Sequence, residues 1–188
     1  MQFSLFGAAV AEPSLEDLGG VLLAGGQWVR SGAGARLSVV VAEQWRADAL
    51  VEAFTEREVA EPRAAMVFAE GGVAVRTAFR PELLPRALRW TRGANHAPPE
   101  DFQLTAGGLR LWAITGGRAD DSGFVLSTAE LDDVVHLAAG AQLSRLGLAG
   151  VSLTRRAGGP GWRVTSTKRL RRLGELLGEP PPGADWPG

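Results

Sequence analysis

The stretch Leu18–Trp28, LGGVLLAGGQW, decides how the rest of the chain is interpreted. Its leucines follow helical spacing, and Ser14 and Asp17 ahead of it form the pattern of a capped helix start. Gly25–Gly26 ends the predicted helix, and the residues after it are typical of a strand. The stretch therefore predicts a short apolar helix that leads directly into a sheet.

The elements after this helix follow an order that occurs twice. In the first half, QWVRS and RLSVVVAE predict a hairpin, residues 45–58 a helix, RAAMVFAE and VAVRTAF a second hairpin, and residues 81–90 a short helix. A second apolar stretch that ends in Gly-Gly, Thr105–Gly117, begins a similar series about 90 residues later. The sequence therefore predicts an α+β fold built from a duplicated αββαββα unit.

This repeat also predicts where the halves begin and end. We expect a first half over residues 1–92, a proline-rich linker over 93–104, a second half over 105–178 and a disordered tail over 179–188. Because the duplication supplies both halves in one chain, we expect a monomer.

The composition excludes several classes of function. With 45% hydrophobic residues in 188, the chain can bury a sizeable core. It has no cysteine, so disulfides, thiolate metal sites and cysteine nucleophiles are excluded. The apolar N-terminus is too short for a spanning helix and lacks the basic flank of a signal peptide. We therefore expect a cytoplasmic protein without membrane contact.

An apolar helix that ends in glycine, begins each half and leads into a hairpin resembles the motif helix of the LAGLIDADG homing-endonuclease family. LGGVLLAGG (Leu18–Gly26) is similar to that motif except at its acidic positions, and LRLWAITGG (Leu109–Gly117) is similar more loosely. The resemblance implies two helices packed closely at the centre of the molecule. Small residues would allow that approach: Gly19, Gly20 and Ala24 in the first helix, Ala113 and Gly116 in the second.

The resemblance also bears on catalysis. Active members of the family bind a divalent cation through an acidic residue at the end of each motif helix, because hard cations prefer oxygen ligands. The matching positions here are Gly25 and Gly116, which have no side chain to offer a metal. We therefore expect a catalytically inactive protein with no catalytic residue, metal or cofactor. A residual magnesium-dependent nuclease that uses Asp120 or Asp121 is one alternative.

The family binds duplex DNA, so the resemblance implies that basic residues form the contact. No Asp or Glu falls between Val151 and Arg172, a pattern that favours attraction to a polyanion. The candidate DNA-binding residues in this segment are Arg155, Arg156, Arg163, Lys168, Arg169, Arg171 and Arg172. Further and weaker candidates lie on or beside predicted strands: Arg30, Arg36, Arg76 and Arg118.

Two other interpretations of these residues stay open. The run KRLRR is also typical of the solvated face of a helix, with Arg171 and Glu175 spaced to form an ion pair. The duplicated scaffold could instead bind a protein partner, which predicts an apolar or mixed sheet surface. The leading interpretation is a DNA-binding protein with a regulatory or accessory role in DNA transactions.

Overall fold

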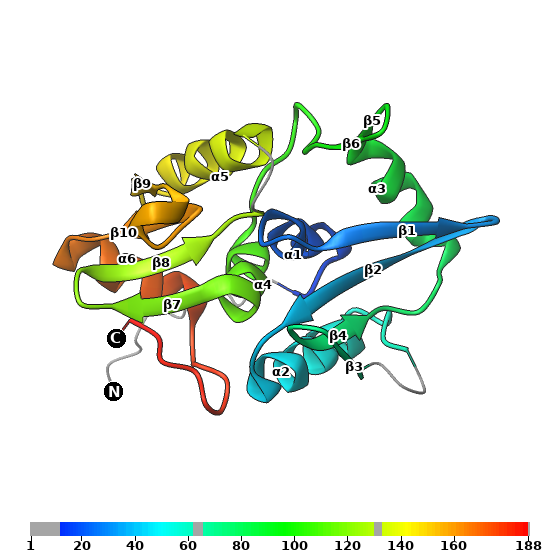
Figure 1. Cartoon of the computed structure of the whole chain (residues 1–188), viewed down its shortest axis with the longest axis horizontal. Helices are drawn as coiled ribbons and strands as arrows, with labels where there is room; N and C mark the ends of the chain where they lie inside the picture. The colour runs from blue at the N-terminus through cyan, green and yellow to red at the C-terminus, as the bar shows by residue number, and fades with distance from the viewer. Residues whose placement is uncertain (1–11, 62–65, 130–132, 188) are drawn as a thin grey trace, which may run out of the picture.

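The glycine stops and apolar periodicities of the sequence correspond to the element boundaries. A computed structural model describes residues 12–61, 66–129 and 133–187 (Figure 1). The first half contains η1 (Leu15–Asp17), α1 (Leu18–Leu23), β1 (Gln27–Ser31), β2 (Gly34–Val41), α2 (Gln44–Glu56), β3 (Met66–Ala69), β4 (Gly72–Arg76), η2 (Pro81–Leu83) and α3 (Leu84–Arg89). The second half contains α4 (Ala106–Gly116), β7 (Gly117–Asp120), β8 (Gly123–Ser127), α5 (Asp133–Arg145), β9 (Val151–Leu153), η3 (Arg155–Ala157), β10 (Gly161–Val164) and α6 (Thr167–Leu177).

Each half builds one antiparallel sheet, and both sheets have the same strand order. The order is β1-β2-β4-β3 in the first half and β7-β8-β10-β9 in the second. The predicted α+β fold with two αββαββα halves is therefore confirmed. Within the described residues, no helix is both long enough and apolar enough to cross a membrane.

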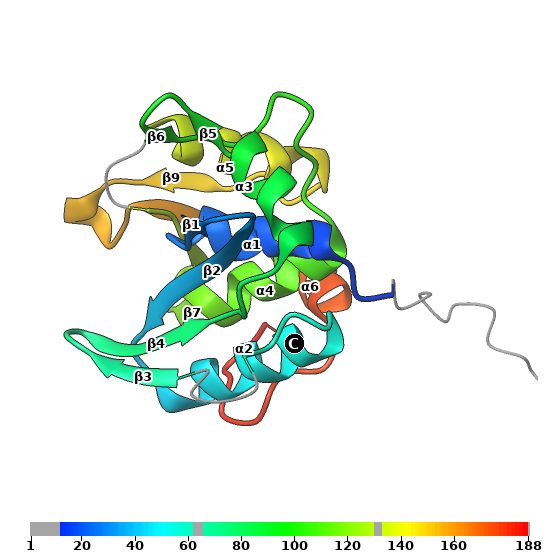
Figure 2. The ribbon, with the colours of Figure 1, turned by 90° about the vertical axis from the view of Figure 1, so that its right-hand side faces the viewer.

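Helices cover one face of both sheets. On β2, Leu37 and Val39 are buried in the core, whereas Arg36 and Val40 point to the opposite side, as strand alternation requires. Phe124 of β8 enters the same core from the second sheet. Figure 2 shows the strands at the left of the molecule and α1, α4 and α6 to their right. We call the side of the sheets that faces away from these helices the outer face.

The two motif helices, α1 and α4, pack against each other at the centre of the molecule through their backbones. A Cβ atom on Gly20 would lie only 1.7 Å from the carbonyl oxygen of Gly108. Nearer the other end, a Cβ on Gly116 would lie 3.5 Å from the Cβ of Ala24. The close approach expected from the small residues is therefore present.

The register of that contact differs in part from the expected one. Gly19 faces the ring of Phe102 instead of the partner helix, with its would-be Cβ 2.6 Å from that ring. Gly108, which is not among the small residues expected at the contact, meets Gly20. Gly108 lies in the first turn of α4, one residue before the segment that resembles the family motif.

One buried carboxylate ties the starts of both motif helices together. Asp17 accepts a hydrogen bond from Thr105 Oγ1 at 2.6 Å and another from Arg57 Nη2 at 2.6 Å. Thr105 caps α4, since its hydroxyl accepts from the backbone N–H of Gly108. Asp17 also accepts from the backbone N–H of Ser14, which completes the predicted capping box. Because a buried charge is tolerated only when it is paired, this network fixes the two halves against each other.

The far end of α4 is capped by an arginine from the other half. Arg46 of α2 is buried and donates to the carbonyl oxygens of Ala113, Ile114 and Gly117 at 3.3, 2.8 and 2.7 Å. The last carbonyls of a helix lack partners within the helix, and a cation is favoured beside them. The first half thus supplies the group that ends the motif helix of the second.

Two segments are more ordered than the sequence indicated. The expected linker contains half of a small hairpin, β5 (Thr91–Arg92) and β6 (Asn95–His96). Residues 179–187, expected as a disordered tail, contact both halves, since Gly183 lies against Trp45 of α2. Arg110 donates to the carbonyls of Leu177 and Glu179, and its guanidinium lies 4.8 Å from the ring centroid of Trp186. These tertiary contacts, which composition does not reveal, hold the segment in place.

The helix contact generates the first prediction. Replacing Gly20 by alanine inserts a methyl group where the backbone of Gly108 lies, so the helices must separate. We expect Gly20→Ala to lower the free energy of unfolding by about 3 kcal/mol, measured by chemical denaturation. Gly32→Asn is the matched control, because Gly32 has no atom within 4 Å of its would-be Cβ and asparagine tolerates its positive φ. Equal stability of the two variants would contradict the contact.

Candidate functional site

The outer face of the first sheet carries two of the predicted arginines. Arg36 lies on β2, and its guanidinium carbon is 4.6 Å from the ring centroid of Phe79. Arg76 lies on β4 directly opposite Ser38, which is two residues from Arg36 and therefore on the same side of the sheet. The structure thus brings together two cations that lie 40 residues apart in the sequence.

The outer face of the second sheet carries a similar pair. Arg118 of β7 and Arg163 of β10 both pair with Val125, which lies on the strand between them. Arg163 donates to Asp120 Oδ2 from Nε at 2.8 Å and from Nη2 at 2.6 Å. Arg118 donates to the hydroxyl of Ser127 and to the carbonyl of Gly158. These hydrogen bonds fix both guanidinium groups over the strands.

A turn at the edge of the second sheet adds two more of the predicted residues. Arg155 and Arg156 belong to η3, between β9 and β10, and both are exposed. Figure 2 shows this orange segment at the left of the molecule, on the side away from α4 and α6. The turn therefore borders the outer face.

The remaining basic residues lie elsewhere. Leu173 and Leu177 of α6 pack into the core, so α6 covers the inner side of the second sheet. Its exposed cations are thus separated from the outer face by the body of the molecule: Lys168, Arg169, Arg171 and Arg172. Arg30 also points away from the outer face, because it pairs with the buried Ala35 on β2. The predicted set therefore divides into two groups on opposite sides.

The outer face is not uniformly basic. Four apolar side chains on or beside the first sheet are exposed by about two fifths to one half: Val29 by 39%, Val40 by 49%, Val67 by 40% and Phe79 by 40%. Their strand positions place the three valines on the same side as Arg36 and Arg76. The surface is therefore a mixture of arginines and apolar side chains, which is the kind of sheet surface that the protein-partner interpretation predicts.

The ends of the motif helices hold no acidic side chain in their final positions. Gly25 adopts a φ of +107°, which favours glycine. A Cβ atom on Gly25 would lie 3.9 Å from the Cβ of Ala129. Gly116 lies against Ser127 and Ala24. In the described parts of the chain, no cluster of three His, Asp or Glu side chains could hold a metal ion.

Asp120 lies on the outer face and accepts hydrogen bonds from two groups there. Burial of its carboxylate favours the neutral form, but hydrogen bonds from the backbone N–H of Ser122 and from the Arg163 guanidinium outweigh that effect. The pKa of Asp120 is therefore lower than its ordinary value. A carboxylate already occupied by an arginine is a poor candidate for a metal ligand.

Comparison with known proteins supports the fold. No family model matches the chain, and no curated protein matches it. Among solved structures, the homing endonuclease I-WcaI bound to its DNA recognition sequence is similar, with a TM-score of 0.60 and 13% sequence identity. The match covers 86% of this chain and 79% of that chain. The homing-endonuclease fold implied by the sequence resemblance is therefore confirmed.

The Asp120–Arg163 contact generates the second prediction. Arg163→Met removes two hydrogen bonds to the Asp120 carboxylate, so we expect the pKa of Asp120 to rise. Carboxyl-carbon NMR titration measures this change, and the other carboxyl signals should not move between the two proteins. Because the folded-state pKa is lowered, the pair stabilises the protein above the pKa that Asp120 has when unfolded.

The Asp120–Arg163 pair also determines how the stability of the protein depends on pH. The stabilisation by the pair is lost as the pH falls through the folded-state pKa of Asp120. The difference in unfolding free energy between wild type and Arg163→Met should therefore be largest near neutral pH and shrink in acid. A difference that grows on acidification would contradict the pairing.

Proposed function

We propose that this chain binds duplex DNA across the outer faces of its two sheets, as a monomer, and does not cleave it. The observation that carries the proposal is the placement of arginines on both sheets: Arg36 and Arg76 on the first, Arg118 and Arg163 on the second. A guanidinium can bind a phosphate or the edge of a guanine through two parallel hydrogen bonds. A solved protein of similar fold is bound to its DNA recognition sequence, which supports the same use of the fold here.

The proposal of an inactive protein rests on the motif helices. Gly25 and Gly116 occupy the positions where the family resemblance implies acidic metal ligands. A glycine can offer only its backbone carbonyl, so it cannot replace a carboxylate as a charged ligand. The role we infer is regulatory or accessory: the protein would occupy or shape a DNA site without changing its covalent structure.

The two groups of basic residues give a direct test, the third prediction. In the double variant Arg36→Glu/Arg76→Glu, repulsion of phosphates replaces attraction on the outer face. We expect affinity for a labelled random-sequence duplex to fall about tenfold or more, with a shallower dependence on salt, in fluorescence anisotropy. The matched control is Lys168→Glu/Arg171→Glu, which makes the same charge change on α6.

Because α6 lies on the other side of the molecule, the control should retain most of its affinity. A larger loss in the α6 variant would move the DNA contact to α6 and overturn the proposed surface. Cleavage of the duplex that requires magnesium would contradict the inactive interpretation, and loss of that cleavage in Asp121→Asn would favour a residual nuclease.

The fourth prediction is a substitution that should raise, and not lower, the affinity for duplex DNA. Asp120→Asn removes one negative charge from the outer face and leaves Arg163 without a charged partner. Asparagine keeps the shape and a hydrogen-bond acceptor, so the turn should fold unchanged. We expect duplex affinity to rise about fivefold at low salt and the gain to vanish at high salt. Unchanged affinity at low salt would exclude the second sheet from the interface.

A protein partner is the second candidate function, and the exposed Val29, Val40, Val67 and Phe79 favour it. Isolated apolar side chains are common on protein surfaces, but four on one side of a sheet form a surface that aromatic or aliphatic groups could cover. Absence of duplex binding at low salt would favour this function. In that case Val40→Asp should disturb the partner contact without changing the fold.

A further inference from the structure

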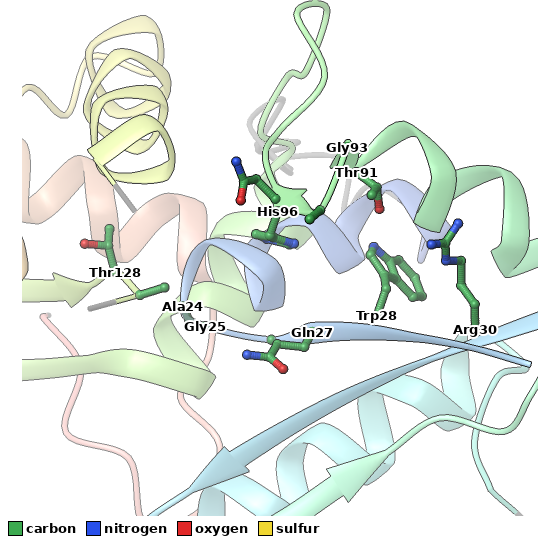
Figure 3. Close-up of a pocket in the computed structure, with 13 residues that line it drawn as sticks. Ala24, Gly25, Gln27, Trp28, Arg30, Thr91, Gly93, His96 and Thr128 are labelled. Carbon is green, nitrogen blue, oxygen red and sulfur yellow. The ribbon is translucent and has the colours of Figure 1, made fainter. Parts of the chain in front are cut away.

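A cavity lies where the two halves meet, at the end of α1. Its volume is about 710 Å³, within the range of small-molecule sites, and residues of both halves line it. The first half contributes the end of α1, the start of β1 and the β5–β6 hairpin, and the second contributes Thr128 and Ala129. Figure 3 shows Trp28 and Arg30 rising from β1 on the same side, toward Thr91.

The cavity is not a necessary product of the duplication. At the corresponding end of α4, the guanidinium of Arg46 lies against the end of the helix and donates to three carbonyl oxygens. The segment after α6 also packs there, with Gly183 against Trp45. The segment after α3 is instead the β5–β6 hairpin, which forms one wall of the cavity. One of two equivalent positions is therefore filled by the chain, and the other is open.

The groups that line the cavity include strong hydrogen-bond donors. The indole N–H of Trp28 is buried and has no acceptor among the described residues. Arg30 contributes a guanidinium two residues along the same strand, and Asn95 contributes an amide. The positive charge of Arg30 in this lining favours an anion.

The size and shape of the lining narrow the ligand further. The volume is far larger than a single phosphate requires, which leaves room for an attached ring. Trp28 provides an aromatic side chain of the kind on which bases stack, and the amide of Asn95 can both donate to and accept from the edge of a base. Arg30 provides the cation for a phosphate. An aromatic ring that carries a phosphate meets all three requirements.

The cavity opens beside the outer face. Gln27, at its border, pairs with Ser38 and so lies on the outer side of β1, whereas Trp28 lies on the inner side. Figure 3 shows Gln27 pointing to the other side of the strand from Trp28 and Arg30. Because β1 is an edge strand, a ligand can pass around it from the outer face into the cavity.

We propose that this cavity holds a single nucleotide, with its base on Trp28 and its phosphate on Arg30. The nucleotide could come from either of two sources: a free nucleoside monophosphate, or one nucleotide unstacked from a bound duplex. The second source rests on the proposed function, whereas the first does not. Removing a base from the stack costs least where it is mispaired, which makes the two sources separable.

The first arm of the test, and the fifth prediction, uses free nucleotides. Wild type is titrated by calorimetry with dAMP, dGMP, dCMP and dTMP, and with inorganic phosphate alone. We expect at least one nucleotide to bind more tightly than phosphate, and Arg30→Gln to weaken it about tenfold. Asn95→Ala should weaken it without removing a charge. Arg92→Gln, on the same hairpin but outside the cavity, is the matched control and should bind as wild type does.

The second arm uses two duplexes that differ only in one mismatched pair. If the nucleotide comes from DNA, the mismatched duplex should bind wild type about tenfold more tightly than the paired one, and Asn95→Ala should abolish that preference. The Arg36→Glu/Arg76→Glu variant should lose affinity for both duplexes but keep its affinity for the free nucleotide. If the wild-type protein binds a free nucleotide but neither duplex, the proposed function is overturned and this site stands.

Two results would overturn the site. Phosphate that binds as tightly as every nucleotide would show that the cavity does not recognise a base. No nucleotide binding together with equal affinity for both duplexes would show that it takes no nucleotide from either source. Because Arg30 and Asn95 are exposed, neither substitution removes a core contact, and circular dichroism can verify that each variant is folded.

Discussion

The contact between the backbones of Gly20 and Gly108 is the constraint on which the rest of the structure depends. Helices that carry ordinary side chains at their contact are held 8–10 Å apart, whereas glycine allows a closer approach. That approach lets Asp17 of the first half reach Thr105 of the second, and lets Arg46 reach the last turn of α4. The two sheets are attached to these helices, so the helix contact also determines how the outer faces lie relative to each other.

The duplication is close in topology but not in chemistry. Both sheets have the same strand order, yet one motif helix ends in a tight glycine turn and the other is capped by a buried arginine. On the first sheet, Arg36 lies over the ring of Phe79, whereas on the second sheet Arg163 is paired with Asp120. The halves thus keep a common framework while the chemistry of their surfaces differs.

Local patterns in the sequence predicted the framework well and the site only in part. Glycine stops, a capping box and strand alternation are local signals, and the predicted order of elements and the Ser14–Asp17 cap are confirmed. The basic run between Val151 and Arg172 was continuous in sequence but crosses from a strand to a helix. A strand alternates every two residues and a helix turns every 3.6, so neighbouring arginines in such a run point to opposite sides of the protein. Arg46 and Trp186 contact residues that are distant in the chain, Ile114 and Arg110 respectively. No local sequence pattern predicts such contacts.

The helix contact also bears on how the chain folds. Gly20 and Gly108 are 88 residues apart in the sequence. Forming their contact therefore costs more conformational entropy than forming a local hairpin does. Neither motif helix can bury its inner side before the other arrives, and Asp17 has no hydroxyl of Thr105 to bind until then. One cluster of buried residues spans both halves, so we expect the two halves to unfold as one cooperative unit.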